Sequence, residues 1–167
     1  QVVAANCARV QEALRVLEEF ARNNTSSLAQ TAATIRYGLY DLEVTCLKAT
    51  SAARRRSRLD DARLCLLTCP STNLVPTVEE ALRSGVPMVQ YRDKTANDRQ
   101  QFQEATSLAE LCKRYGALFI VNDRIDLALA VNADGVHLGQ DDFPTDVARR
   151  LIGSERLLGR STHTLDQ

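Results

Sequence analysis

From residue 64 onward, the sequence alternates between short apolar runs and longer segments with helical spacing. The clearest run is Ala117 to Val121, which is followed by a helical segment over 124–132 and a further apolar run from Gly135. Five successive apolar residues are typical of a parallel strand that is buried on both faces. A helix between two such strands is the crossover that parallel pairing requires. The sequence therefore predicts an α/β fold with a parallel sheet.

Five segments have this strand character, and helical segments separate them. The predicted strands are 64–68, 88–92, 117–121, 135–140 and 157–161. The helices between them are expected to begin near Thr77, near Asn97 or Asp98, at Arg124 and with Pro144 in a first turn. Both a (β/α)₈ barrel and an open doubly wound sheet fit this pattern. No glycine-rich phosphate loop follows the first strand, so the dinucleotide and P-loop fingerprints are absent.

Residues 1–58 follow a different pattern, with apolar residues every three or four positions. One such set is Val3, Cys7, Val10, Leu14, Leu17 and Ala21, and the other is Leu28, Ala32, Ile35, Leu39, Leu42 and Cys46. Each set predicts one apolar stripe on a helix, and the turn residues 23–26 between them predict an antiparallel hairpin with Ser26 or Ser27 as N-cap. Because two helices bury a single seam, the hairpin needs a further surface, either the following domain or a second copy.

The arginine-rich stretch over 49–63 is interpreted as a solvated linker. We therefore divide the chain into a helical extension with linker, 1–58, and an α/β part, 59–167. Composition bears on which partners the chain can bind. With 21 basic and 21 acidic residues, the chain has no net charge that would favour binding to nucleic acid or to a membrane surface. No apolar run approaches the ~20 residues of a membrane span. Five scattered cysteines argue against a complete disulfide framework and favour buried, reduced thiols in the cytoplasm.

Candidate functional residues follow the predicted strands. Asn122 and Asp123 come directly after 117–121, and Asp141 and Asp142 come after the next strand. Ligands bind at the carboxyl ends of parallel strands in α/β folds. Carboxylates at that edge suit Mg²⁺, which takes oxygen ligands and is often bridged to phosphates. The alternative is that Asp123 and Asp142 are solvated loop carboxylates or helix N-caps.

Gln90, Arg92 and Lys94 are spaced two apart, so they share one side of the second strand while it lasts. A guanidinium and an ammonium group that face a barrel interior need an anionic partner. Arginine offers a planar fork for phosphate and lysine a compact charge. Together with the carboxylates, these residues favour a diphosphate site over the alternative, an Arg–Asp ion pair at the sheet rim.

Four motifs, in order, resemble the thiamine-phosphate synthase family over about residue 64 to the end. They are Gln90-x-Arg92-x-Lys94, Asn122-Asp123-Arg124-x-Asp126-Leu127-Ala128, Ala133-Asp134-Gly135-Val136-His137-Leu138-Gly139-Gln140-Asp141-Asp142 and Gly159-x-Ser161-Thr162-His163. Residues 13–22 resemble the N-terminal extension of some members, for which a link to pyrimidine phosphorylation is one suggestion.

The resemblance implies an incomplete TIM (β/α)₈ barrel, with about five strands present, preceded by the α-helical hairpin. It implies an alkyl-transferring enzyme of thiamine biosynthesis that joins hydroxymethyl-aminopyrimidine diphosphate to hydroxyethyl-methylthiazole phosphate and yields thiamine phosphate and pyrophosphate. The partners would be these two small molecules, and the cofactor would be Mg²⁺. A homo-oligomer is compatible with the resemblance.

The family's roles carry over by motif. Gln90, Arg92 and Lys94 would hold the pyrimidine diphosphate. Asn122 would bind the same substrate, and Ser161 would lie beside its diphosphate or pyrimidine. Asp123 and Asp142 would bind Mg²⁺, with Asp141 outside the set. No nucleophile or catalytic base is implied. His137 is expected inside the barrel, and Asp126 and Asp134 at a helix start and a turn.

Two departures qualify the resemblance. Arg160 occupies a position where the family has a small apolar residue. The chain also stops after the fifth strand, whereas a (β/α)₈ domain takes about 200 residues or more. We therefore expect a fragment that is inactive alone. The alternatives are a thiazole-processing or regulatory relative of the same fold, and a non-catalytic phosphate-binding or assembly module.

Overall fold

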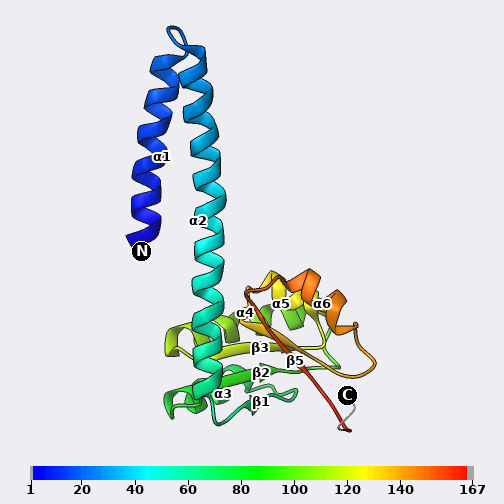
Figure 1. Ribbon diagram of the computed structural model, residues 1–167. Helices are drawn as coiled ribbons and strands as arrows, with labels where there is room; N and C mark the ends of the chain where they lie inside the picture. Colours follow the sequence, from blue (N-terminus) through cyan, green and yellow to red (C-terminus); the bar gives the residue numbers. More distant parts are fainter. Residues whose placement is uncertain (1, 165–167) are drawn as a thin grey trace. The chain divides into compact units, whose positions relative to one another are not determined.

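The computed structural model describes residues 2–164, and these form two compact units, Gln1–Thr50 and Ser51–Gln167. The first unit is the predicted helix hairpin, built from α1 (Val2–Ala21) and the first part of α2 (Ser26–Asp61) (Figure 1). The carbonyl of Thr25 accepts hydrogen bonds from the backbone N–H groups of Leu28 and Ala29. Thr25 is therefore the N-cap, one residue before the two serines predicted for that position.

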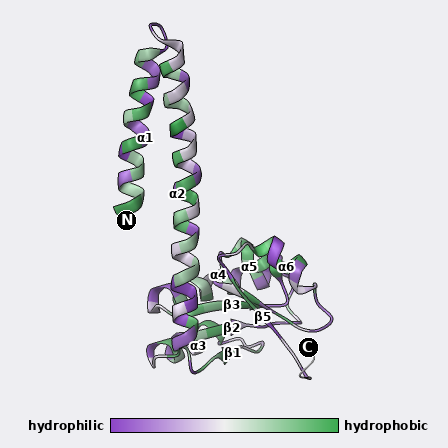
Figure 2. Cartoon of the chain, viewed as in Figure 1, coloured by the Kyte–Doolittle hydropathy of each residue, from purple (hydrophilic) through white to green (hydrophobic). Residues whose placement is uncertain are grey.

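The seam between the two helices uses only part of each predicted stripe. Ala21 and Ala32 are buried in it, whereas Val10 and Leu17 remain about half exposed, at 48% and 50%. Polar pairs complete the seam: Gln11 Nε2 donates to Glu43 Oε2 at 2.8 Å, and Glu18 pairs with Arg36 at 2.9 Å. The contact between two helices is narrower than the apolar stripe of either one. Apolar residues therefore remain exposed along α1 and α2, as the green segments in Figure 2 show.

The linker predicted over 49–63 is wrong, because α2 continues as a helix to Asp61. This stretch contains no Gly or Pro, and Ala and Arg are good helix formers. Arg55, interpreted above as part of a solvated run, is 8% exposed. Its Nε donates to Asp134 Oδ1 at 2.9 Å and its Nη1 to the carbonyl of Glu155 at 3.1 Å. The last part of α2 therefore belongs to the second unit.

The second unit is a five-stranded parallel sheet with a helix in each connection (Figure 1). Its strands are β1 (Leu66–Leu67), β2 (Met88–Tyr91), β3 (Leu118–Asn122), β4 (Gly135–Leu138) and β5 (Leu157–Arg160). Its connecting helices are α3 (Leu74–Arg83), α4 (Asp98–Tyr115), α5 (Ile125–Ala130) and α6 (Thr145–Ile152).

The strand order is β1-β2-β3-β4-β5, and every neighbouring pair is parallel. Doubly wound sheets reverse their order at a switch point, and no reversal occurs here. The α/β fold with a TIM-like strand order is therefore confirmed, and the open doubly wound alternative is excluded. The first strand is shorter than predicted, and Leu67 is 54% exposed because β1 pairs with β2 alone.

One face of the sheet packs against the helices and forms the core. Val89, Val121 and Val136 are at most 1% exposed on this face, and the Tyr91 hydroxyl donates to Glu104 of α4 at 2.8 Å. Since side chains alternate along a strand, Gln90 and its equivalents on the other strands lie on the opposite face. The sheet thus separates the face that packs on the connecting helices from the face that carries the candidate site, where Leu59 of α2 borders an apolar cavity.

The helix boundaries largely follow the predicted turn residues. The Asn97 side chain accepts from Gln100 N at the start of α4, and Gly116 ends that helix at φ 73°. Two starts differ from prediction: α3 begins at Leu74 rather than at Thr77, and Pro144 is the N-cap of α6 rather than part of its first turn. Phe102 of α4 is 47% exposed, although its spacing with Ala105 and Cys112 in the sequence predicts an inward-facing side chain.

All five cysteines are free thiols, but the expectation that they are buried is wrong for Cys46, Cys65 and Cys69, which are exposed. Cys112 is 1% exposed, and burial raises the pKa of its thiol to about 12. Among the described residues, no helix combines the length and apolar character that crossing a membrane requires.

Candidate functional site

The carboxyl ends of β2 and β3 bring two predicted site residues together. Gln90 lies in β2 and Asn122 is the last residue of β3, and both are partly buried. The Gln90 Nε2 group donates to Asn122 Oδ1 at 2.7 Å. This bond fixes both amides relative to each other and leaves one Gln90 N–H, the Gln90 carbonyl oxygen and the Asn122 NH₂ group for other partners.

A second polar pair lies on β4 and β5. His137 Nε2 is 3.0 Å from the Ser161 hydroxyl, and His137 is paired in register with Gly159. A Cβ atom at residue 159 would lie 2.5 Å from His137 Nδ1, so only glycine lets the imidazole lie against β5. His137 was expected inside the barrel, and its contact with Ser161 was not predicted. Residues 159 and 161 share a strand face, and this alternation was the signal available.

Asp123 sits in a strained backbone conformation directly after β3. Its φ is 62°, in the left-handed region that L-residues other than Asn and Asp rarely adopt. Its backbone N–H donates to the His137 carbonyl at 2.8 Å, and its Oδ2 accepts from Lys94 Nζ at 3.0 Å. The structure therefore brings Lys94 and Asp123 together from the loops after β2 and β3.

The loop after β4 holds Asp142 through its own backbone. Asp142 Oδ2 accepts from the N–H of Gly139 at 2.6 Å. Arg160, the unexpected residue on β5, donates from Nη1 to the Phe143 carbonyl and from Nη2 to the Gln140 carbonyl, both at 2.9 Å. Arg160 therefore ties β5 to the loop that carries Asp142.

A hollow of about 430 Å³ adjoins this loop. Its lining residues are Gln140, Asp141, Thr145, Arg160, Ser161 and Thr162. Asp141 is exposed in this hollow, and Asp142 is absent from its lining. Over residues 2–164, no group of three or more His, Cys, Asp or Glu side chains is arranged to hold a metal ion.

The Arg92 backbone is held while its side chain is exposed. Its N–H donates to Thr68 Oγ1 at 2.9 Å, and Thr68 is 6% exposed at the end of β1. The Arg92 guanidinium makes no ion pair with any of the residues that the structure describes. The Arg–Asp rim pair, the alternative weighed for this position, is therefore not formed among them. No sequence pattern indicated that Thr68 accepts a hydrogen bond from the Arg92 backbone.

The sheet face that carries Gln90 and His137 also borders an apolar cavity, farther from the carboxyl ends of the strands. A cavity of about 160 Å³ is lined by Leu59 of α2 together with Met88, Gln90, Ile120, Val136, His137, Leu157, Leu158 and Gly159. The polar groups of Gln90 and His137 thus lie above an apolar floor. Amide, hydroxyl and cationic groups gathered above such a floor are suited to an aromatic ring that carries an anionic group.

Residues 64–167 match the sequence profile of the thiamine monophosphate synthase family. The chain belongs to this family. Residues 1–45 match a second profile, that of the ThiD2 family. The thiamine monophosphate synthase match contains all seven predicted site residues.

Similar proteins carry corresponding names. The chain is 65% identical over 167 residues to a thiamine-phosphate synthase of Synechococcus sp. (strain CC9605), and 67% identical to one of Parasynechococcus marenigrum (strain WH8102). It covers 47% and 48% of those proteins, so it spans about half the length of the curated relatives it matches. A solved thiamine phosphate pyrophosphorylase from Pyrococcus furiosus superimposes with a TM-score of 0.56 and 38% identity, covering 61% of this chain and 51% of that one.

Proposed function

We propose that this chain forms the pyrimidine-diphosphate side of a thiamine-phosphate synthase, a transferase of thiamine biosynthesis. One observation carries the proposal: Lys94 and Asp123, from two adjacent loops, meet at 3.0 Å beside the Gln90–Asn122 amide pair. A cation and a carboxylate at the carboxyl edge of a parallel sheet suit a diphosphate and its counter-ion. The family match over 64–167 supports the same conclusion.

Each residue type has a role in this reading. Arg92 and Lys94 would bind diphosphate oxygens, and Gln90 and Asn122 would orient the substrate through their amides. The Ser161 hydroxyl, held by His137, would lie beside the diphosphate or the pyrimidine. We assign no nucleophile and no catalytic base.

The donor set of Asp123 and Asp142 fits Mg²⁺. Mg²⁺ is held in proteins by one or two carboxylates, and water and substrate phosphates complete its octahedron. Carboxylate oxygens suit Mg²⁺ better than zinc, which is bound mostly by thiolate and imidazole ligands. When bound, Mg²⁺ supplies positive charge that stabilises the departing pyrophosphate.

The reaction needs charge stabilisation and orientation. The C–O bond between the pyrimidine methylene carbon and the diphosphate breaks, and its electron pair leaves with pyrophosphate. The ring nitrogen of the thiazole phosphate forms the new C–N bond to the same carbon. Arg92 and Lys94 would neutralise the charge that grows on the leaving oxygen. The polar pairs would hold the aminopyrimidine so that its ring stabilises the electron-poor carbon.

We also propose a two-part organisation, with a helical extension over 1–58 and the synthase part over 59–167. The two profile matches, 1–45 and 64–167, support it. The compact units divide somewhat earlier, between Thr50 and Ser51, because Arg55 pairs with Asp134. Small-molecule substrates are the partners we propose, and the cytoplasm is the compartment, which the five free thiols favour.

A binding experiment on the chain as it stands tests the core of the proposal. Calorimetric titration with pyrophosphate should give binding that requires Mg²⁺. Asp123→Asn should weaken it at least tenfold, whereas Asp141→Asn, a matched change at an exposed neighbouring carboxylate, should leave it unchanged. Equal behaviour of the two variants would remove Asp123 from the site.

The activity is tested on the chain joined to the remaining C-terminal sequence of the Synechococcus sp. (strain CC9605) relative. Incubation with both substrates and Mg²⁺ should yield thiamine phosphate and pyrophosphate, and Asp123→Asn should abolish the product. Pyrophosphate binding without any product would favour the non-catalytic phosphate-binding module instead.

A further inference from the structure

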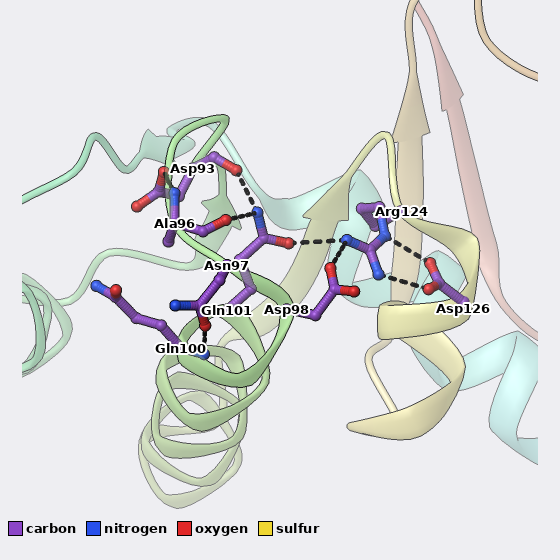
Figure 3. A network of polar contacts seen from close by, with 8 residues as sticks. All are labelled: Asp93, Ala96, Asn97, Asp98, Gln100, Gln101, Arg124 and Asp126. Carbon is purple, nitrogen blue, oxygen red and sulfur yellow. Dashed lines mark hydrogen bonds and ion pairs between the residues drawn. The ribbon is translucent and has the colours of Figure 1, made fainter.

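A buried glutamine pins the loop that carries Lys94. Gln101 lies in the first turn of α4 and is 7% exposed. Its Nε2 donates to the carbonyl of Asp93 at 3.0 Å and to the carbonyl of Ala96 at 3.1 Å (Figure 3). Both hydrogens of the amide are therefore used on backbone acceptors of one loop. An amide is required here, because a carboxylate would have no hydrogen to donate.

The same loop is also held from within. Asp93 Oδ1 accepts from the N–H of Thr95 at 2.7 Å, from the Thr95 hydroxyl at 2.8 Å and from the N–H of Ala96 at 3.0 Å. Lys94 lies inside this turn, between residues whose backbones are fixed on both sides. Its backbone thus starts from a defined position even though its side chain is 59% exposed.

Arg124 connects this loop to the one that carries Asp123. Its Nη1 donates to Gln101 Oε1 at 3.0 Å and to Asp98 Oδ1 at 2.8 Å. Its Nε and Nη2 form a bidentate pair with Asp126 at 2.8 and 2.6 Å (Figure 3). The planar guanidinium is therefore held from both sides, and its backbone directly follows the strained residue Asp123.

These hydrogen bonds join Gln101 and Arg124 to Asp93, Ala96, Asp98 and Asp126, and not to Gln90, Asn122 or Ser161. Asp98 and Asp126 accept hydrogen bonds from Arg124, and Gln101 donates to the backbone of the loop after β2. The two loops that these bonds join carry the Lys94–Asp123 ion pair. A site held in its productive geometry before binding avoids the free-energy cost of ordering its loops when the ligand arrives.

We propose that Gln101 and Arg124 are positioning residues that lock the loops after β2 and β3 together and so fix the spacing of Lys94 and Asp123 for the diphosphate. This inference rests on the proposed function, since the diphosphate is the ligand for which the spacing matters. The link runs from Gln101 through the 93–96 turn to Lys94, and from Gln101 through Arg124 to Asp123.

The test uses the variants Gln101→Met and Arg124→Lys in the full chain. Gln101→Met keeps the side-chain length and removes all three hydrogen bonds, and Arg124→Lys keeps the charge and removes the fork. Gln103→Met, at an exposed position of the same helix, is the matched control. Calorimetry measures pyrophosphate affinity with Mg²⁺, and amide hydrogen exchange without metal measures the protection of Thr95 and Ala96.

Both variants should bind Mg²⁺-pyrophosphate about 10- to 100-fold more weakly, the usual effect of removing an outer-shell partner. Thr95 and Ala96 should exchange about tenfold faster, with far-UV dichroism unchanged and the Cys112 thiol still protected. A purely structural role would lower the melting temperature but leave affinity unchanged well below it. Wild-type affinity and exchange in Gln101→Met and in Arg124→Lys would overturn the inference.

The two proposals fail in different ways. If the wild-type chain binds no pyrophosphate with Mg²⁺, the proposed function is wrong, and exchange at Thr95 and Ala96 alone decides whether the loops are coupled. If the wild type binds and both variants bind within twofold of it, the positioning role is wrong and the proposed function survives.

Discussion

Replacing Asp123 by Ala and by Asn separates the cost of its backbone conformation from the function of its carboxylate. At φ 62°, the left-handed backbone conformation of an alanine costs about 1–2 kcal/mol of folding free energy, whereas asparagine adopts this region readily. Both variants lose the ion pair with Lys94, whose side chain is 59% exposed, so the pair contributes only ~0.5 kcal/mol. We therefore expect Asp123→Asn to lower the free energy of unfolding by ~0.5 kcal/mol and Asp123→Ala by ~2 kcal/mol.

The measurement must report on the second unit alone, and Cys112 provides the probe. This thiol is 1% exposed in the core of the sheet, so brief labelling after equilibration in urea reports the unfolded fraction of that unit. A difference of ~1.5 kcal/mol corresponds to about 5 °C in melting temperature for a domain of this size. Pyrophosphate affinity with Mg²⁺ is measured on the same samples.

Two results would refute the reasoning. If Asp123→Ala and Asp123→Asn unfold at the same urea concentration, the left-handed backbone carries no cost in solution. If the two variants differ in pyrophosphate affinity by as much as they differ in stability, the carboxylate and the fold have not been separated. The expected result is a shared loss of affinity and an unequal loss of stability.

Three further predictions follow from buried contacts. Gly159→Ala should lower the free energy of unfolding by about 1–3 kcal/mol in urea unfolding, because the new Cβ would lie 2.5 Å from Nδ1 of the His137 imidazole. Arg55→Met should cost about 2–3 kcal/mol in urea unfolding, since it leaves a partly buried carboxylate without its partner. Raising the pH should destabilise the fold through Cys112: its stabilising contribution is complete below the ordinary thiol value of 9.0 and is lost toward pH 12, by ~1.4 kcal/mol per pH unit.

Each of these has a control within the chain. Gly38→Ala meets nothing within 4 Å and should stabilise α2 by about 0.5–1 kcal/mol, so a loss there would show that glycine replacement is harmful for another reason. Arg56→Met, at the exposed neighbour of Arg55, should change stability by less than ~0.5 kcal/mol. Cys112→Ala should remove its share of the alkaline slope, and an unchanged slope would contradict the assignment.

Local patterns predicted most of the second unit. The apolar runs of β2, β3 and β4 are buried strands, and α4 begins after Asn97 as expected. These features depend on residues near one another in sequence, where hydrophobic period and capping chemistry are decisive. The linker predicted over 49–63 was wrong even though its Ala and Arg residues favour a helix. The burial of Arg55 within that helix has no local signal, because its partner Asp134 is 79 residues away.

The candidate site divides in the same way. Spacing alone put Gln90, Arg92 and Lys94 on one side of a strand, and position after strands marked Asn122 and Asp123. Spacing could not reveal that Asp123 has a positive φ or that His137 lies against Gly159, since both depend on the register between neighbouring strands.

The sequence by itself determined the parallel α/β class, the helix hairpin and the residue types at the carboxyl edge, because periodicity and turn chemistry act over short distances along the chain. Tertiary structure alone decided the strand order, which excludes a doubly wound sheet, and the joining of two loops through Gln101 and Arg124. A hydrogen bond between residues 23 positions apart has no local pattern, and it exists because parallel pairing brings the carboxyl ends of β2 and β3 to one edge.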